Sequence, residues 1–213
     1  PGNIPVDIEW IAADIATAAG LNDVISAVRN SGRTLDVLVN NAGIQQAIDL
    51  QMEAPDSFRA KTENEIAINL TAPLALVQGL LPLIRRNGGT IVNVTSLLSR
   101  HPKASAPVYC ATKAAVISLT QSAGLNLIKH GINVNAIAPG VVDGEHWDGV
   151  DALFAKHEGL EPGEKKAAVG AAVPFGRMGT AEDLTGMAVF LASSEADYIL
   201  AQTYNVDGGN WMS

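Results

Sequence analysis

The 213-residue sequence has one cysteine, few aromatic residues and no long uninterrupted apolar run. Its single cysteine, Cys110, cannot form an internal disulfide, which fits a reducing compartment, and we expect a cytoplasmic protein. No apolar run reaches the roughly 18 residues that a membrane-spanning helix needs, and no signal peptide is recognisable. We therefore expect no membrane partner and no disulfide-rich secreted fold.

Basic residues are also scarce, with 14 Lys and Arg against 22 Asp and Glu and a net charge of −8. A nucleic-acid partner requires clustered Lys and Arg to neutralise phosphates, and only isolated pairs such as Arg85-Arg86 occur. The composition therefore disfavours a nucleic-acid partner, and we expect none. With 47% hydrophobic and 17% charged residues, the chain can form one globular domain with a substantial core.

The chemistry of the chain is concentrated in residues 107–119. Tyr109 and Lys113 lie four positions apart in a segment with helical spacing, so an ammonium lies beside a phenol on one helix face. Upstream, the apolar strand expected at 90–94 ends in Thr95 and Ser96. Open α/β sheets bind ligands where strand carboxyl ends face helix N-termini. These residues suit proton transfer to or from an alcohol or a ketone.

The phenol must be acidified to work near neutral pH. Tyrosine has an ordinary pKa of about 10, so a drop of about 3 units is required, which corresponds to about 4 kcal/mol. A neighbouring cation typically supplies about 1–3 units, so Lys113 alone is marginal. A second positive charge, such as an oxidised nicotinamide, would close the gap. For an isolated Tyr-Lys pair, a packed tyrosine with a solvated lysine is the commoner explanation.

Several further motifs accompany this pair. Asn40-Asn41-Ala42-Gly43 follows an apolar strand at 35–39, Asn69 lies within 66–70, and Pro139-Gly140 follows a strand at 132–137. Together with the serine, tyrosine and lysine, this order and spacing resembles the short-chain dehydrogenase/reductase family from about residue 10 to residue 213. Residues 107–213 closely resemble the polyol (sorbitol and galactitol) dehydrogenases, whereas the earlier part resembles another branch of the family.

The resemblance implies a role for each of four residues. Tyr109 would be the acid/base, Ser96 would hold the substrate oxygen, and Lys113 would tune the phenol and bind the cofactor ribose. Asn69 would anchor a proton-relay water. From the residues alone, a core asparagine with satisfied hydrogen bonds is an equally good explanation of Asn69, because an unpaired amide on this apolar segment would be costly.

The resemblance also implies a set of cofactor contacts. Val142 would hold the nicotinamide carboxamide through its backbone N–H, and Asp14 would contact the adenine, although Asp14 could also be an ordinary turn residue. Where family members commonly have a threonine this chain has Gly144, which removes one side-chain bond to the cofactor. The whole set is Asp14, Ile15, Asn41, Ala42, Gly43, Tyr109, Lys113, Pro139, Gly140 and Val142.

The segment at about 143–175 corresponds to the family's substrate lid, and it is rich in Gly, Glu and Lys. His146 and Trp147 would contact a small-molecule substrate along with Ser96 and Tyr109, since an imidazole binds hydroxyls and an indole packs on C–H faces. The acidic and histidine residues of the lid lack the spacing of a metal site, so we expect no metal.

Alternating strands and helices predict a doubly wound parallel sheet, a Rossmann-like α/β fold. Strands are expected at 8–15, 35–39, 90–94, 132–137 and 199–206, and helices at 22–30, 63–86, 108–129 and 182–193. The long helix at 63–86 should bend at Pro73 and Pro82. Family members usually pair through this helix and the one that carries Tyr109, so we expect a homotetramer or a homodimer.

No GxxxGxG motif, the turn that binds the cofactor pyrophosphate, occurs before Asn40. We therefore expect one domain over residues 1–213 that is N-terminally incomplete and lacks the first strand–helix–strand unit. The residue that selects NAD over NADP belongs to that unit, so both remain candidates, with NAD favoured by the resemblance. Without that unit, either the segment 8–14 pairs with the strand 35–39, or one edge of that strand stays bare.

The leading hypothesis is an oxidoreductase that interconverts a secondary alcohol, such as sorbitol or galactitol, and a ketone by hydride transfer with NAD(P). Two alternatives stay open. The first is a non-catalytic interaction module or an inactive fragment of such an enzyme. The second is a reductase of another small ketone.

Overall fold

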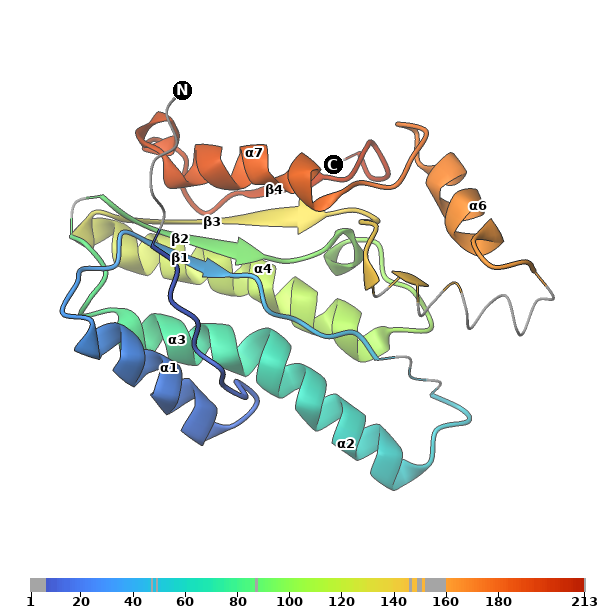
Figure 1. Ribbon diagram of the computed structural model, residues 1–213, viewed down its shortest axis with the longest axis horizontal. Helices are drawn as coiled ribbons and strands as arrows, with labels where there is room; N and C mark the ends of the chain where they lie inside the picture. Colours follow the sequence, from blue (N-terminus) through green and yellow to red (C-terminus); the bar gives the residue numbers. More distant parts are fainter. Residues whose placement is uncertain are drawn as a thin grey trace.

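The computed structural model describes residues 7–46, 48, 50–86, 88–145, 147–148, 151 and 160–212. At its centre lies a parallel sheet with the strand order β1-β2-β3-β4, so each strand lies beside its predecessor in the chain (Figure 1). The strands are β1 (Val37–Asn40), β2 (Gly89–Val94), β3 (Ile132–Pro139) and β4 (Thr203–Val206). Helices connect successive strands, which is the parallel α/β arrangement that the sequence predicts.

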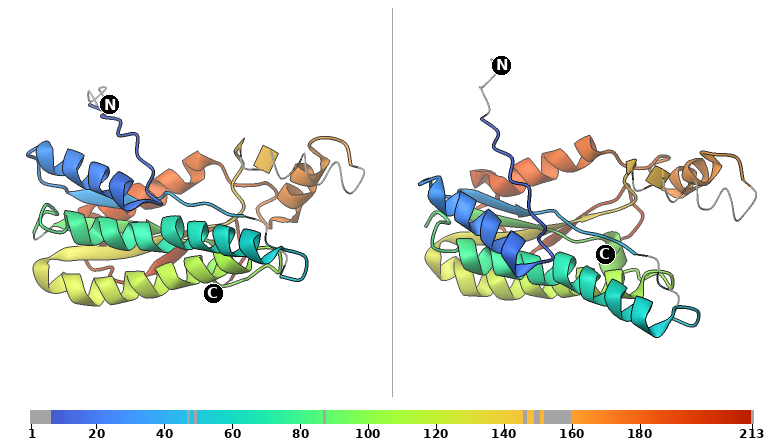
Figure 2. Two further views of the ribbon diagram at one scale, coloured as in Figure 1. Left: turned by 90° about the horizontal axis from the view of Figure 1, so that it is seen from below. Right: turned by 60° about the horizontal axis from the view of Figure 1, so that its bottom comes forward.

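Helices cover both faces of the sheet (Figures 1 and 2). The helices α1 (Ala18–Asn30), α3 (Ala72–Leu80) and α4 (Pro107–Leu127) lie on one face, and α7 (Ala181–Ala192) lies on the other. Two apolar clusters fill the layers: Ile84, Ile91, Leu127, Ile132 and Val134 form the first, and Val92, Ile137, Leu191 and Ala196 form the second, against α7. Helices on both faces explain why β2 and β3 are almost continuously buried.

The helix predicted at 63–86 is wrong as a single element. The structure has α2 (Pro55–Ile66), a π-helical turn at Ala67–Thr71, and α3, which ends at Leu80. Pro73 is one physical reason, because it has no N–H to donate to the carbonyl of Asn69 as an α-helix requires. The wide turn lies just before this proline, and the helical path continues through it from α2 into α3.

The strand predicted at 8–15 is also wrong, because these residues have no strand pairing. A strand needs a neighbour, and within the described residues β1 is paired on one side only, with β2. The chain instead turns at Asp14, whose carbonyl oxygen accepts hydrogen bonds from the backbone N–H and the hydroxyl of Thr17. Trp10 is exposed, as is Val39 on β1. Of the two outcomes expected for β1, the structure shows the bare edge.

Other boundaries differ by a few residues. α1 begins at Ala18 because the Thr17 hydroxyl caps it by accepting from the Gly20 N–H at 3.1 Å. α4 continues into a 3₁₀ turn (Ile128–His130) and ends at the left-handed Gly131, as predicted. The segment predicted as the lid contains a helix, α6 (Glu164–Ala172), and short 3₁₀ turns occur at Leu97–Ser99 and Ser194–Ala196. Within the described ranges, every helix is too short or too polar to cross a membrane.

Candidate active site

Several of the sequence motifs lie at one edge of the sheet, where the parallel strands end. Asn40 ends β1, Ser96 follows β2 by two residues, and Pro139 ends β3. Because all four strands point the same way, these residues share the carboxyl edge, where the arrowheads in Figure 1 point. Such edges are where doubly wound sheets place ligands.

Tyr109 and Lys113 face this edge from the first two turns of α4, which begins at Pro107. Lys113 is 4% exposed; its Nζ donates to the carbonyl oxygen of Val94 at 2.9 Å and lies 5.8 Å from the centre of the Tyr109 ring. The Thr95 hydroxyl donates to the carbonyl oxygen of Lys113 at 2.9 Å and fixes the helix against the end of β2. The structure thus brings the hydroxyl, phenol and ammonium together.

Burial sets the pKa values of this pair. Burial is the largest effect on Tyr109 and raises its pKa. A hydrogen bond with Ser96 lowers this pKa in part, and the nearby Cys110 and Glu65 raise it further. Burial also lowers the pKa of Lys113 to about 8. Near neutral pH the lysine therefore keeps its charge and the phenol keeps its proton. A further positive charge has to act before Tyr109 can ionise near pH 7, as the reference values indicate.

Asn69 lies in the π-helical turn and is 1% exposed. Its Oδ1 accepts from the Ile44 N–H at 2.8 Å, and its Nδ2 donates to the Ile44 carbonyl oxygen at 2.8 Å and the Thr112 hydroxyl at 3.2 Å. The side chain is thus satisfied by the protein, as the core-asparagine explanation requires. A water anchored at this residue would have to bind its backbone carbonyl, which does not receive an N–H from Pro73.

The residues after β1 fit a cofactor that approaches the backbone closely. Asn41, Ala42 and Gly43 are exposed, and a Cβ on Gly43 would lie 3.0 Å from Lys113 Nζ and 3.3 Å from Asn69 Oδ1. Among the described residues, the Val94 carbonyl is the only acceptor that Lys113 meets, although an ammonium has three N–H groups. Donors therefore remain for ribose hydroxyls, and this stretch can hold a nicotinamide cofactor.

The other predicted cofactor residues lie in two places. Asp14 and Ile15 form the turn before α1, where Asp14 Oδ1 accepts from the Ala16 N–H at 3.0 Å. Pro139, Gly140 and Val142 follow β3, and Val142 forms a bridge with Gly179. A hollow of about 200 Å³, lined in part by Val142 and Asp207, lies beside this second group.

The predicted substrate residues of the lid are only partly described. Trp147 is half-buried, and its backbone N–H donates to the Gly144 carbonyl oxygen at 2.9 Å. His146 lies outside the described residues. In the part of the chain that the structure describes, no three His, Cys, Asp or Glu side chains are grouped as metal ligands.

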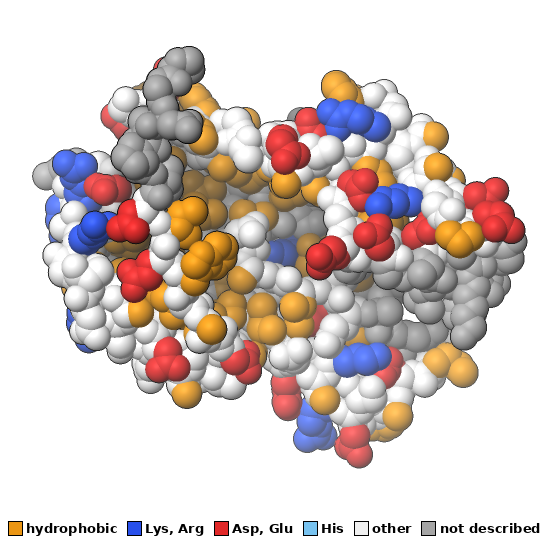
Figure 3. Space-filling model, in the orientation of Figure 1, with side chains coloured by type: hydrophobic (Ala, Val, Ile, Leu, Met, Phe, Trp, Pro, Cys, Tyr) orange, Lys and Arg blue, Asp and Glu red, His pale blue; other side chains and the backbone are white. Residues whose placement is uncertain are grey.

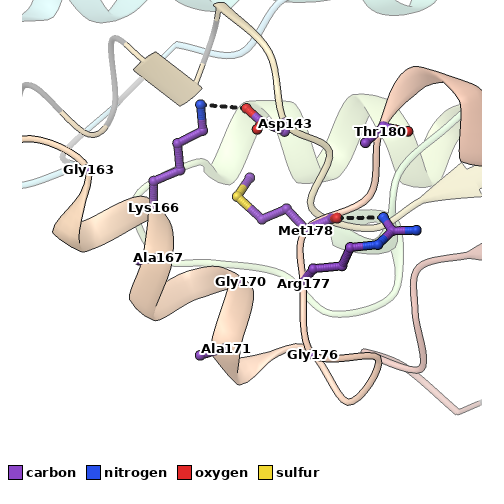
Figure 4. Close-up of a pocket in the computed structure, with 10 residues that line it drawn as sticks. All are labelled: Asp143, Gly163, Lys166, Ala167, Gly170, Ala171, Gly176, Arg177, Met178 and Thr180. Atoms are coloured by element: carbon purple, nitrogen blue, oxygen red, sulfur yellow. Dashed lines mark hydrogen bonds and ion pairs between the residues drawn. The ribbon is translucent and has the colours of Figure 1, made fainter.

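A cavity of about 480 Å³ separates α6 from the turn after β3 (Figure 4). Lys166 reaches across it from α6 to Asp143 at 2.5 Å and also contacts Asp148 at 2.7 Å. The carboxylate of Asp151 accepts from the backbone N–H groups of Gly163 and Lys166 at the start of the helix. None of the predicted catalytic residues lines this cavity, so it is distinct from the predicted acid/base site.

The loop after Ser96 is fixed by the C-terminal segment, which the sequence did not reveal. Arg100 Nη1 donates to Asn205 Oδ1 at 2.6 Å, and the rings of His101 and Trp211 lie 4.9 Å apart. No spacing rule pairs residues a hundred positions apart, so only the fold could show these contacts of Arg100 and His101.

Seen from the face in Figure 3, the molecule has a central hollow bordered by apolar and acidic side chains.

The serine, phenol, buried ammonium and amide lie near the carboxyl edge of a parallel sheet, and such an arrangement can transfer a proton to or from an alcohol or a carbonyl. Comparison with known proteins gives the same class. The family model described as enoyl-(acyl carrier protein) reductase matches residues 3–210. The chain therefore belongs to the short-chain dehydrogenase/reductase family, as the motifs indicated, and is an NAD(P)-dependent oxidoreductase.

Individual relatives are more specific. The chain is 56% identical over 205 residues to a sorbitol dehydrogenase of Cereibacter sphaeroides and 52% identical to a galactitol 2-dehydrogenase of Agrobacterium fabrum. Each match covers 95% of this chain and 78% of the relative. The fold is similar to that of L-sorbose reductase from Gluconobacter frateurii, solved with NADPH and L-sorbose, with a TM-score of 0.86 and 31% identity. That match covers 95% of this chain and 76% of the other.

Proposed function

We propose that this chain oxidises a secondary hydroxyl of a polyol such as sorbitol or galactitol, and reduces the corresponding ketone. The observation that carries the proposal is the 56% identity with a sorbitol dehydrogenase, in a chain whose Ser96, Tyr109 and Lys113 meet at one edge of the sheet. The match covers 95% of the chain, so it extends over the predicted lid as well as the predicted acid/base residues.

Each residue has a task in the oxidation. Tyr109, as phenolate, accepts the proton of the substrate hydroxyl, and in reduction the phenol returns it to the ketone oxygen. The Ser96 hydroxyl accepts from the Leu98 N–H at 3.1 Å and forms a hydrogen bond with Tyr109, and a substrate oxygen bound between the two hydroxyl groups would take the place of that second bond. Lys113 holds its charge beside the phenol and opposes the effect of burial on that pKa.

A nicotinamide cofactor would supply or take up the hydride at the substrate carbon. Asn41, Ala42 and Gly43 would lie against it, Lys113 would bind its ribose, and Val142 would meet its carboxamide. We propose NAD as the preferred form, on the strength of the likeness to polyol dehydrogenases. The structures of some relatives were solved with NADPH or NADP, so the comparison of both cofactors belongs in the assay.

Steady-state rates test the proposal. The purified protein should be assayed with sorbitol, galactitol and simple ketones, each with NAD(H) and NADP(H), and Tyr109→Phe serves as the inactive control. We expect the highest kcat/KM for a polyol with NAD. If only simple ketones react, the chain is a reductase of another class of ketone. If nothing reacts and no cofactor binds, the chain is a non-catalytic module.

We also propose a cytoplasmic homo-oligomer. The single cysteine supports a reducing compartment. Leu74 on α3 and Leu125 on α4 are exposed, and they lie on the two helices that the family resemblance suggests as pairing surfaces. Sedimentation analysis should show a dimer or a tetramer that Leu125→Asp weakens; a monomeric parent at micromolar concentration would exclude this pairing.

A further inference from the structure

A carboxyl group lies buried near the site without a basic partner. Glu65, in the last turn of α2, is 0% exposed, and no ion pair to a described residue compensates it. Its Oε1 accepts from the Gln46 N–H at 2.5 Å, whereas its Oε2 has no partner among the described residues. Burying a carboxyl group in this way is costly, so its retention points to a task beyond packing.

Glu65 binds the same loop as Asn69, one helical turn away. Asn69 binds both backbone groups of Ile44, and Glu65 binds the backbone N–H of Gln46. The two side chains thus hold the loop 44–46 at two points, two residues apart. This loop directly follows Asn41–Gly43, the stretch that fits the cofactor, and α2 packs against the helix that carries Tyr109.

We propose that Glu65 is a positioning residue of the active site. Its carboxyl group fixes the loop 44–46 on the helix that carries Asn69, and its charge acts on Tyr109 across the contact between α2 and α4. The positioning part stands on geometry alone. The part concerning turnover rests on the proposed function.

The electrostatic part has a definite sign. The groups that act on the phenol are Ser96 after β2, Glu65 from α2, and Cys110 and Lys113 from α4. Burial raises the pKa of Glu65, and the carboxyl group in its ionised form raises the pKa of the phenol. Removing this negative charge must therefore move the Tyr109 titration to lower pH.

Three variants separate the two roles. Glu65→Gln keeps an acceptor for the Gln46 N–H but removes the charge, and Glu65→Ala removes both. Glu63→Gln is the matched control, because it removes the same charge from an exposed position of the same helix. The first measurement is amide hydrogen exchange at Gln46, with the Ile44 amide, held by Asn69, as an internal reference in the same molecule.

Exchange at Gln46 should be about tenfold or more faster in Glu65→Ala, since the lost bond involves a charged acceptor. The amide should stay protected in Glu65→Gln and Glu63→Gln, and the Ile44 amide should stay protected in all three variants. Unchanged exchange at Gln46 in a folded Glu65→Ala protein would overturn the positioning role. This measurement needs no substrate, so it stands whether or not the proposed function holds.

The second measurement is the pH dependence of kcat/KM for the substrate that the parent turns over best. Glu65→Gln should move the limb that reports Tyr109 to lower pH, while Glu63→Gln should leave it in place. Glu65→Ala should in addition lose about 10–10²-fold in kcat/KM, as expected when reacting groups are misplaced. A limb that stays in place in Glu65→Gln would refute the electrostatic role.

Discussion

Replacing Lys113 by Met should leave the folded chain at least as stable near pH 7 and yet remove its activity. Burial lowers the pKa of Lys113 from 10.5 to about 8. At about 1.36 kcal/mol per unit, this shift of about 2.5 units (10.5 − 8) costs the folded state about 3 kcal/mol whenever the ammonium is charged. Methionine keeps much of the apolar stem and carries no charge, so the cost disappears.

The pH dependence gives the sign of the effect. Below about pH 8 the lysine is charged in both the folded and unfolded states, and the full cost is present. Between about pH 8 and 10.5 the folded state releases its proton first, so the stability of the parent rises with pH by up to about 3 kcal/mol. Above that range the cost is gone. The Met variant lacks this rise.

Urea unfolding followed by circular dichroism, at pH 7 and at about pH 10, measures this difference. The lost bond to the Val94 carbonyl costs about 1–3 kcal/mol, so near pH 7 we expect the variant to lie between parity and about 2 kcal/mol above the parent. The other titrating groups are shared, so they cancel in the comparison. A stability difference that is the same at both pH values would refute the reasoning from burial.

The other predictions concern the site and the lid. Tyr109→Phe should lower turnover by about 10²–10⁴-fold without changing the circular dichroism spectrum; a loss under threefold would exclude Tyr109 as the acid/base. In Lys113→Met, any residual activity should show its alkaline limb at higher pH, and an unmoved limb would leave the lysine only a ribose-binding role. Lys166→Met removes the ion pair between α6 and Asp143 and should raise KM more than it changes kcat. If KM and kcat of the variant both equal those of the parent, this ion pair does not hold the predicted lid in place. Asn69→Ala should destabilise the fold by about 1–3 kcal/mol, measured in urea, because the Ile44 backbone groups lose their partner.

Sequence analysis was most accurate for the elements whose own residues show a clear apolar run or helical spacing. The apolar run at 90–94 and the helix at Pro107–Leu127 lie where expected, because continuous burial and helical spacing are local signals. The strand at 8–15 failed because pairing depends on a neighbour, which no local pattern reports. The recognition of the family is confirmed, whereas the roles of the individual site residues stay predictions.

Glu65 shows why part of the site escaped sequence analysis. A glutamate in a polar helix such as 55–66 is normally assigned to the solvated face. Here the helix packs so that this side chain turns inward to Gln46, 19 positions away, and the polar character of the segment hides the fact. An inward-facing carboxyl group can be recognised only once the packing of α2 on α4 is known.

The π-helical turn at Ala67–Thr71 determines how this helix would respond to the deletion of one residue. The N–H of Ala72 binds the carbonyl of Ala67, five residues back, where a regular α-helix would bind four residues back, so the wide turn takes up one extra residue within a single turn. Deleting one residue here would restore a regular helix and leave α2 in nearly the same rotational phase relative to α3. Glu65 lies outside the wide turn and would keep its bond to the Gln46 N–H, whereas Asn69 lies inside it and would be displaced from Ile44. We therefore expect single-residue deletions in 67–71 to break the Ile44 contact and to spare the Gln46 contact.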